Sequence, residues 1–231
     1  DNVLKNKYKI LVKKEIPLQS GMGGGSMNAA NILNYFYKKK LINLKKLKKY
    51  SLKIGSDVIL GLNSKPKILY RDGSIKEVTD IKKYHILIVK PAFGCSTKKI
   101  YSSNKTFSKS EFNISKEKIV KNVILNGKND LEKSAFNLYP ALKKIKNLLN
   151  QNEKANFVRM TGSGSAIIMY FNSNKFAKNA LKIYKRKLND AKSPFDELLV
   201  FIEKERRNGK CNVKDIPSIK HFFQLLNDVL S

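Results

Sequence analysis

The sequence predicts an α+β fold arranged as two subdomains. Short apolar runs typical of strands occur beside longer stretches in which apolar residues recur every three or four positions, as in amphipathic helices. The two kinds of segment are mixed along the chain and do not alternate regularly, so a parallel sheet built from repeated strand–helix units is not expected. The 231 residues suffice for one large domain or two small ones.

The first predicted elements surround a glycine cluster. Residues 8–13 indicate a short strand, which Pro17 stops. From Asn28 the apolar residues recur with helical spacing, at Ala29, Ile32, Leu33 and Phe36. A second helix is expected after Asn43 as N-cap, with Gly55 at its C-terminal cap. Its inward positions are predicted to be Leu44, Leu47, Ser51 and Ile54.

The second half of the chain predicts a sheet covered by helices. Residues 84–90 form an apolar strand that ends at Pro91, and residues 155–161 and 165–171 form two strands joined by Gly162-Ser163-Gly164. Helical patterns occupy about 130–149 and 174–188, and a further helix begins near Ser193 and runs to about 207. We therefore expect a first domain over 1–80, a second over 81–189 and an unassigned helical tail over 190–231.

The net charge of +29 suggests polyanion binding, but the kind of basic residue argues against specific recognition of nucleic acid. The chain has 42 lysines and only 5 arginines, and arginine is the residue best suited to bidentate contacts with phosphate and guanine. The lysines are also spread along the whole sequence. We expect no specific nucleic-acid partner, and we keep a noncatalytic basic nucleic-acid-binding protein as an alternative.

The remaining bulk features favour a cytoplasmic protein without a membrane partner. The sequence has no apolar run of the roughly 18 residues that a membrane span needs. Cys95 and Cys211 are far apart and are expected to be reduced thiols. His85 and His221 are interpreted as structural, and no His/Cys cluster indicates a zinc site. Oligomeric state is not predicted.

The segment most informative about chemistry is the glycine cluster between the first strand and the first helix. Four of the five residues from Gly21 to Gly25 are glycine, which allows a backbone to approach an anion closely. The N-terminus of the following helix favours negative charge, and Ser26 adds a hydroxyl that can reach a phosphate or, through phosphates, a magnesium ion. The alternative is a tight turn capped by Ser26 or Asn28, which four clustered glycines fit poorly.

The cluster differs from the two commonest nucleotide motifs. The pattern G-x-x-x-x-G-K-[ST] is absent, and the dinucleotide pattern G-x-G-x-x-G fails because Ser26 occupies the third glycine position. Residues 17–30 instead resemble the second signature of the GHMP kinases, G-L-G-G-G-S-S-[DN]-A-A. Within that superfamily the sequence is most similar to the 4-(cytidine 5′-diphospho)-2-C-methyl-D-erythritol kinases of the non-mevalonate isoprenoid (terpenoid) pathway.

Other segments support this narrower resemblance in family order. Residues 54–58 resemble L-G-A-D-V-P, with Ile59 in place of the proline, and residues 89–101 resemble V-x-P-x-x-x-x-S-T-x-x-x-Y. Residues 129–132 match N-D-L-E, Tyr139-Pro140 matches Y-P, and residues 160–165 resemble M-S-G-S-G-S. The resemblance covers about residues 7–188 and implies a ribosomal-protein-S5-like N-terminal subdomain, present in part, and a ferredoxin-like C-terminal subdomain.

The resemblance implies ATP-dependent transfer of phosphate to the 2-hydroxyl of 4-(cytidine 5′-diphospho)-2-C-methyl-D-erythritol, with Mg²⁺. It assigns Asp57 as the catalytic carboxylate, Thr97 and Tyr101 to substrate binding, and Gly162, Ser163 and Gly164 to packing against the nucleotide loop. The implied ATP-binding residues are Pro17, Leu18, Gln19, Ser20, Gly21, Met22, Gly23, Gly24, Gly25, Ser26 and Met27.

Each role has a structural alternative. Asp57 could be a solvated residue in the C-terminal turn of the preceding helix, where its charge is unfavourable. Tyr101 could be a core aromatic residue, and Gly162–Gly164 a simple hairpin turn. Other functional alternatives are a homoserine- or mevalonate-type GHMP kinase and a chain without a stable fold by itself.

One family feature is absent from the 231 residues. The family's P-A-K-I-N-type motif, whose lysine pairs with the catalytic aspartate and the phosphates, has no counterpart. The loss of a single preorganised donor costs about 10²–10³ in rate. We therefore expect impaired activity of this chain alone.

Overall fold

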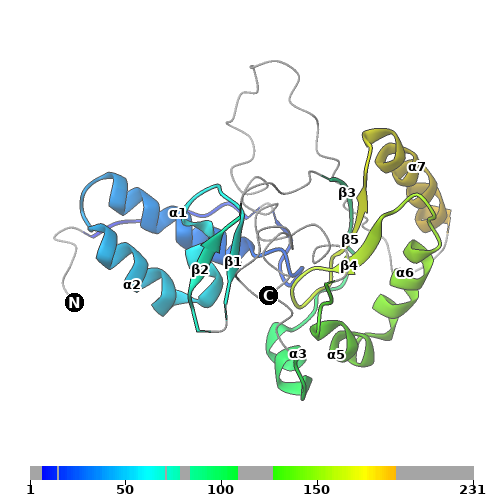
Figure 1. Ribbon diagram of the computed structural model, residues 1–231, viewed down its shortest axis with the longest axis horizontal. Coiled ribbons are helices and arrows are strands. Elements are labelled where there is room, and N and C mark those ends of the chain that lie inside the picture. The colour runs from blue at the N-terminus through cyan, green and yellow to red at the C-terminus, as the bar shows by residue number, and fades with distance from the viewer. Residues whose placement is uncertain (1–6, 15, 71, 79–83, 109–126, 191–231) are drawn as a thin grey trace.

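The computed structural model describes residues 7–14, 16–70, 72–78, 84–108 and 127–190. Figure 1 shows two groups of elements. One holds helices α1 (Gly24–Lys38) and α2 (Leu44–Ile54), the 3₁₀ helix η1 (Ser56–Leu62) and the hairpin of β1 (Lys67–Leu69) and β2 (Ile75–Glu77). The other holds strands β3 (His85–Val89), β4 (Phe157–Met160) and β5 (Ile167–Phe171), with four helices given below. The predicted α+β class is confirmed.

Helices α1 and α2 pack together and against η1. Leu33 and Phe36 of α1 and Leu47 of α2 are buried in their shared core. Asn43 caps α2 as predicted, because its side chain accepts a hydrogen bond from the Lys46 N–H at 2.9 Å, and Gly55 follows the last helical residue. Of the four positions of α2 that were predicted to face inward, Leu47 and Ser51 are buried. Leu44 and Ile54 are exposed, because they lie at the two ends of the helix beyond its packed stretch.

The second group is built on an antiparallel sheet in the order β3–β5–β4. Leu87 lies opposite Met169 in the β3–β5 register, and Val158 lies opposite the same methionine from β4. Alternate residues point to opposite faces, so a strand that is apolar throughout can be buried on both sides. All five residues of β5 are buried. The predicted strands 84–90, 155–161 and 165–171 are confirmed, with shorter bounds.

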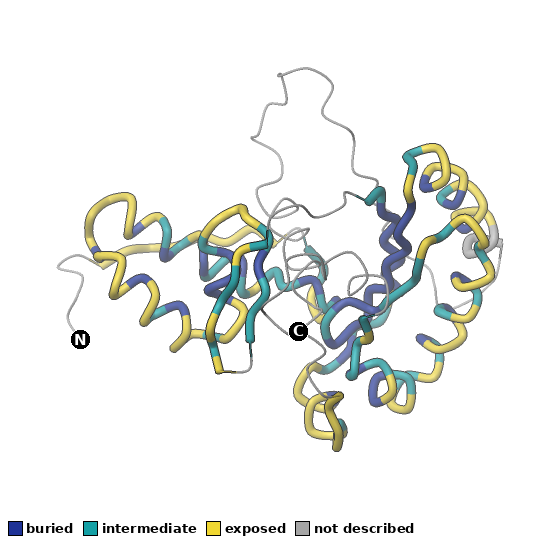
Figure 2. The backbone as a smooth tube through the Cα atoms, viewed as in Figure 1, coloured by how far each residue is buried: buried dark blue, intermediate teal, exposed yellow. Residues whose placement is uncertain are grey.

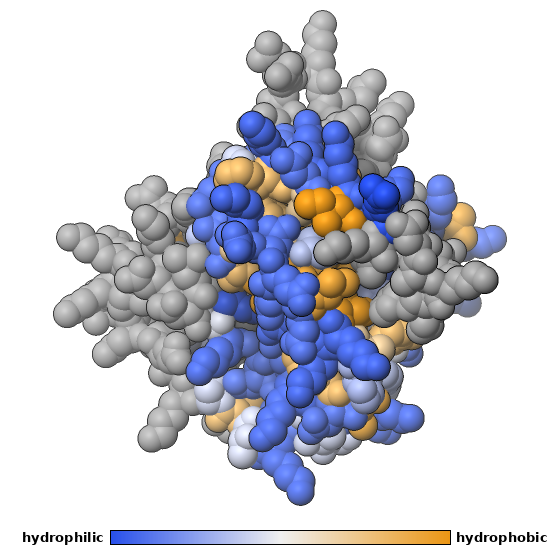
Figure 3. Space-filling view, turned by 90° about the vertical axis from the view of Figure 1, so that its right-hand side faces the viewer, coloured by the Kyte–Doolittle hydropathy of each residue, from blue (hydrophilic) through white to orange (hydrophobic). Residues whose placement is uncertain are grey.

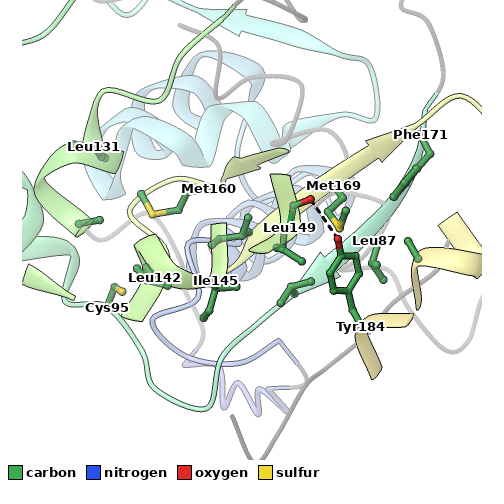
Figure 4. Close-up of a cluster of buried hydrophobic side chains, with 14 of the residues drawn as sticks. Leu87, Cys95, Leu131, Leu142, Ile145, Leu149, Met160, Met169, Phe171 and Tyr184 are labelled. Atoms are coloured by element: carbon green, nitrogen blue, oxygen red, sulfur yellow. Dashed lines mark hydrogen bonds between the residues drawn. The ribbon is translucent and has the colours of Figure 1, made fainter. Parts of the chain in front are cut away.

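One face of this sheet packs against helices α5 (Leu131–Leu138), α6 (Pro140–Asn150) and α7 (Asn174–Asp190). Figure 4 shows this core, in which Leu142, Ile145 and Leu149 of α6 approach the sheet. The Tyr184 hydroxyl of α7 donates a hydrogen bond to the Leu149 carbonyl oxygen of α6 at 3.4 Å. This bond joins the two helices. The outer side of these helices is largely hydrophilic (Figure 3). The dark central strands of Figure 2 show where the core lies.

The opposite sheet face packs against the segment that precedes α1. Ile86 and Ile88 of β3 and Ile168 of β5 form a second cluster with Met22, and Ile16 packs at its margin. The glycine-rich segment is therefore seated directly on the sheet. This packing positions the candidate site between the two groups of elements.

Three further sequence predictions need correction. The predicted strand at 8–13 is irregular and exposed, with 93% of Leu11 accessible, because no strand among the described residues pairs with it. The first helix begins at Gly24, four residues before Asn28, because Gly23 caps it in a left-handed conformation. The single helix predicted over 130–149 is two helices, since Pro140 disfavours a helical residue before it and begins α6. The helix α3 (Thr97–Ser103) was not predicted.

The predicted helix at 174–188 is confirmed by α7. The predicted tail helix, Cys211 and His221 lie outside the described residues. Within the part of the chain that the structure describes, no helix has the length and apolar character to cross a bilayer.

Candidate functional site

The glycine-rich segment forms the entrance to helix α1. Gly23 has φ 63° and precedes Gly24, Gly25 and Ser26, which form the first turn. The N–H groups of a first helical turn have no partner within the helix, and the helix dipole places partial positive charge there. Four glycines and a serine therefore produce an end of α1 that suits an anion.

The carbonyl side of this segment is held by the turn between β4 and β5. Three hydrogen bonds join consecutive residues of the segment to the turn: Ser165 N–H to Gln19 O (3.2 Å), Ala166 N–H to Ser20 O (3.0 Å), and Thr161 Oγ1–H to Gly21 O (3.0 Å). Gly21 has φ 70°, and a Cβ there would lie 2.1 Å from the Thr161 carbonyl oxygen. Only glycine fits this close approach, which fixes the loop against the turn.

The N-D-L-E segment supports the turn from behind. The Asn129 side-chain amide donates to the carbonyl oxygens of Met160 and Gly162, both at 2.8 Å. Glu132 accepts the Met160 N–H at 2.8 Å and pairs with Lys146. The start of α5 is thus hydrogen-bonded to the end of β4 and to the turn that follows it. The resemblance to the kinase family had assigned no role to Asn129 and Glu132.

Asp57 lies in the first turn of η1, and the Ser56 hydroxyl donates to its Oδ1 at 3.1 Å. Helix α2 ends at Ile54, so Asp57 does not lie in its last turn, although the side chain is exposed, as that alternative expected. A carboxylate at the start of η1 is electrostatically favourable. The 3₁₀ helix lies tightly on α1, where a Cβ at Gly61 would come within 2.6 Å of Met27 Cε.

The far end of η1 is held by a buried lysine. Lys67 is 4% exposed, and its ammonium group donates to the carbonyl oxygens of Leu60, Asn63 and Lys65 at 2.8, 3.2 and 3.2 Å. A positive group beside the carbonyl end of a helical segment is favourable. Lys67 therefore helps fix the segment that carries Asp57.

Helix α3 brings Thr97 and Tyr101 to the same site. The segment before it is tied to the loop by a hydrogen bond from the Cys95 N–H to Gln19 O at 2.9 Å. Tyr139, the tyrosine of the Y-P pair, accepts the Ser96 N–H at 3.0 Å through its hydroxyl. Tyr101 is 54% exposed, so the core-aromatic alternative is wrong.

These elements enclose one cleft of about 760 Å³. Of the predicted site residues, Asp57, Thr97, Tyr101, Gly162, Ser163 and all of 17–26 line it. Met27 does not, because its side chain is buried against Leu60. Gly164 packs beneath the turn, where its Cβ would meet Met160.

The sequence analysis missed five residues of the cleft wall: Lys13, Lys14, Ile16, Asn28 and Asn31. Asn28 stands at the [DN] position of the glycine motif, and Asn31 follows one helical turn later, so helical spacing could have found both. Lys13 and Lys14 lie shortly before the loop in the sequence. In a chain so rich in lysine, nothing in the sequence distinguished them from the other lysines.

Two ionisable groups near the cleft have shifted pKa values. Burial raises the pKa of the Tyr101 phenol, and the negative charge of Asp57 raises it further. Burial raises the pKa of the Cys95 thiol to about 11, against a smaller lowering by the Lys90 ammonium group. Both groups are protonated at neutral pH. Among the described residues, no group of three or more His, Cys, Asp and Glu side chains is placed to hold a metal.

Comparison with known proteins places this geometry in a family. Residues 117–190 match the model of the GHMP kinase C-terminal domain. The chain is 54% identical over 187 residues to a 4-diphosphocytidyl-2-C-methyl-D-erythritol kinase of Pelagibacter ubique, covering 80% of this chain and 66% of the relative. It is 34% identical over 199 residues to the enzyme of the same name from Thermodesulfovibrio yellowstonii, covering 78% and 68%. The chain belongs to the 4-diphosphocytidyl-2-C-methyl-D-erythritol kinase family.

Solved structures agree on the fold of this kinase family. A crystal structure of 4-(cytidine 5′-diphospho)-2C-methyl-D-erythritol kinase matches with a TM-score of 0.61 at 22% identity, covering 82% of this chain and 68% of that one. Homoserine kinase from Cytophaga hutchinsonii matches with a TM-score of 0.56 at 14% identity, covering 83% and 68%. The predicted GHMP-kinase fold is thus confirmed. The chain spans about two thirds of the length of the kinase relatives that it matches.

Proposed function

We propose that this chain carries out the reaction for which its relatives are named: transfer of the ATP γ-phosphate to the 2-hydroxyl of 4-(cytidine 5′-diphospho)-2-C-methyl-D-erythritol, a step toward isoprenoid precursors. The observation that carries the proposal is that Asp57 and the glycine-rich loop line the same cleft, although they come from different elements. Phosphoryl transfer depends mainly on positioning and on electrostatic stabilisation. A carboxylate that lines the same cleft as an anion-binding helix end can supply both parts.

The loop from Pro17 to Ser26 binds the ATP phosphates in this proposal. The first-turn N–H groups of α1 are the donors, and the anchored carbonyl groups on the other side of the loop keep them oriented. Lys13 and Lys14, which also line the cleft, add positive charge near the entrance. Met27 supports the loop from the core and does not contact ligand.

Asp57 orients the acceptor hydroxyl and accepts its proton. Thr97 and Tyr101 hold the cytidine-containing acceptor on the opposite wall, with the exposed Tyr101 ring available for stacking on the base. The protonated Tyr101 phenol can also donate a hydrogen bond, since its pKa is raised.

Magnesium fits this cleft only through the nucleotide. Mg²⁺ retains water and takes one or two protein oxygens together with phosphate oxygens. Ser26 Oγ and the Asp57 carboxylate, which both line the cleft, are the protein oxygens proposed for this role. The ion would neutralise phosphate charge when bound. The proposed domains are an ATP-binding part over 1–80 and a C-terminal part over 81–189; the proposed tail over 190–231 lies outside the described residues from residue 191 onward.

The test is ADP release by the full chain with ATP and Mg²⁺, with and without the methylerythritol acceptor, compared with homoserine and mevalonate. We expect release that depends on the named acceptor and falls at least 10-fold in Asp57→Asn. Asp72→Asn is the matched control, because Asp72 is exposed, lies outside the cleft lining and accepts hydrogen bonds from the Ser74 N–H and hydroxyl.

Binding measurements complete this test. Calorimetry with a non-hydrolysable ATP analogue should show binding that Gly25→Ala weakens. Preference for homoserine or mevalonate would indicate a different GHMP kinase. Steeply salt-dependent DNA or RNA binding without any response to ATP would overturn the kinase proposal in favour of a nucleic-acid-binding protein.

A further inference from the structure

Two hydroxyl groups meet at the boundary between the nucleotide and acceptor sides of the cleft. Thr97 Oγ1 and Ser163 Oγ lie 2.8 Å apart, although 66 positions separate them in the sequence. Both residues line the cleft, but their settings differ: Thr97 is exposed at the start of α3, whereas Ser163 is 5% exposed within the β4–β5 turn. The pair therefore joins the buried β4–β5 turn to the exposed start of α3.

Ser163 belongs to the same rigid unit as the phosphate loop. The turn around it donates the three hydrogen bonds that hold the carbonyl groups of Gln19, Ser20 and Gly21. The Asn129 amide fixes the neighbouring Gly162 carbonyl at 2.8 Å. The backbone position of Ser163 is therefore set by contacts that do not involve α3.

The arrangement of protons makes the pair directional. Each hydroxyl has one proton and can accept through its lone pairs. If Thr97 donates its proton to an oxygen of a bound acceptor, the bond between the two side chains requires Ser163 to donate to Thr97 Oγ1. The buried serine can thus orient the threonine and strengthen its donated bond, since linked hydrogen bonds polarise one another.

We infer that Ser163 is a positioning residue that acts through Thr97: it holds the Thr97 hydroxyl in place for the diphosphate or sugar oxygens of the acceptor, and it makes acceptor affinity depend on the phosphate-loop scaffold. This inference rests on the proposed function. It deepens the role of the turn, which the sequence had assigned only to packing against the nucleotide loop.

The experiment measures binding of two probes by calorimetry: cytidine 5′-diphosphate for the acceptor side, and a non-hydrolysable ATP analogue for the nucleotide side. We expect Ser163→Ala to weaken cytidine 5′-diphosphate about three- to ten-fold, the range for one lost neutral hydrogen bond, and to leave the ATP analogue within about two-fold. Thr97→Val tests the same bond from the exposed side, and Thr97→Ser, which retains a hydroxyl, should restore most of the affinity.

The double variant separates positioning from direct contact. If Ser163 acts only through Thr97, adding Ser163→Ala to Thr97→Val should have no further effect on cytidine 5′-diphosphate binding. Ser51→Ala is the matched control: it removes another buried serine hydroxyl, which bonds within α2 to Lys48 O, away from the cleft wall. Both affinities should remain unchanged in this control.

The outcomes distinguish this inference from the proposed function. If the wild-type chain binds neither probe, the proposed function fails and the inference fails with it. If the wild type binds both probes and Ser163→Ala changes neither affinity, or weakens both equally, only the role of Ser163 is overturned. Additive losses in the double variant would likewise overturn action through Thr97.

Discussion

The Lys67 ammonium group donates to the Leu60 carbonyl oxygen at 2.8 Å, at the opposite end of η1 from Asp57. This buried contact joins the first strand of the small hairpin to the segment that carries the candidate catalytic carboxylate. Lys67 does not line the cleft, yet it contacts the segment that carries Asp57.

The first prediction concerns this lysine. Lys67→Met should lower the free energy of unfolding by about 1–3 kcal/mol, because buried carbonyl groups lose their charged donor. Lys65→Met is the comparison: Lys65 pairs with Glu77 where both side chains are exposed, by 68% and 42%, and exposed pairs contribute about 0–1 kcal/mol. Urea denaturation measures both values. Equal effects of the two substitutions would contradict a special role for Lys67.

The second prediction concerns the amide that supports the β4–β5 turn. Asn129→Asp replaces two donated hydrogen bonds by a carboxylate facing the Met160 and Gly162 carbonyl oxygens. We expect a loss of about 2–3 kcal/mol in unfolding free energy and weaker binding of an ATP analogue, since the turn anchors the loop. Thermal melting and calorimetry give these two quantities.

The same substitution at Asn43 provides the control. Asn43 accepts a hydrogen bond from the Lys46 N–H as the N-cap of α2, and aspartate serves this role as well as asparagine. Asn43→Asp should therefore preserve both stability and nucleotide binding. A comparable loss at Asn43 would mean that added negative charge, not the lost donors, explains the Asn129 result.

The third prediction separates folding from binding in the glycine-rich loop. A Cβ at Gly25 would meet nothing within 4 Å, and alanine is favoured over glycine in a helix by about 1 kcal/mol. Gly25→Ala should therefore fold with equal or greater stability, yet bind the ATP analogue more weakly because its methyl group occupies phosphate space. The melting temperature should stay equal or rise, whereas the affinity for the ATP analogue, measured by calorimetry, should fall.

Gly21→Ala gives the contrasting result. Its Cβ would lie 2.1 Å from the Thr161 carbonyl oxygen and its φ is 70°, so the loop must leave the turn. Both stability and binding should fall. Unimpaired ATP-analogue binding in Gly25→Ala would argue that the phosphates do not lie over the first turn of α1.

The fourth prediction concerns alkaline stability. The Cys95 thiol is fully buried, and its pKa is about 11 in the folded chain against an ordinary value of 9.0. Between these values the unfolded chain has lost the thiol proton while the folded chain retains it, so stability falls as pH rises. Each pH unit in this window removes up to about 1.4 kcal/mol.

Cys95→Ala isolates this contribution from the titration of tyrosines and lysines. The variant should lose stability less steeply than the wild type between pH 9 and 11, as measured by urea denaturation at each pH. Parallel curves for the two proteins would show that the thiol does not contribute. Below pH 9 the difference between them should be independent of pH.

The sequence predicted those features that local patterns determine. The cap at Asn43, the sheet strands and the glycine-rich entrance to α1 each follow from residues close together in the chain. Helix α3 was not predicted because Ile100 is the one buried residue among its seven. A single apolar position does not make a periodic pattern. The division at Pro140 was missed because proline is also compatible with the first turn of a helix.

All predicted site residues except Met27 and Gly164 line the cleft, but the contacts that arrange them could not be predicted. Lys67 resembles every other lysine in this chain until its carbonyl partners are known. The same holds for Asn129, whose partners lie about thirty positions away. Such pairings depend on how distant segments pack, which local periodicity does not specify.

The bond from Thr161 to Gly21 spans 140 positions, and this has a consequence for synthesis of the chain. The ribosome completes the glycine-rich segment long before it adds the turn that shapes it, and chains are made from the N-terminus onward. A nascent polypeptide that stops short of Thr161 contains the whole motif but lacks the three donors of the β4–β5 turn that hold its carbonyl groups. If the proposed function holds, nucleotide binding is therefore acquired late in translation.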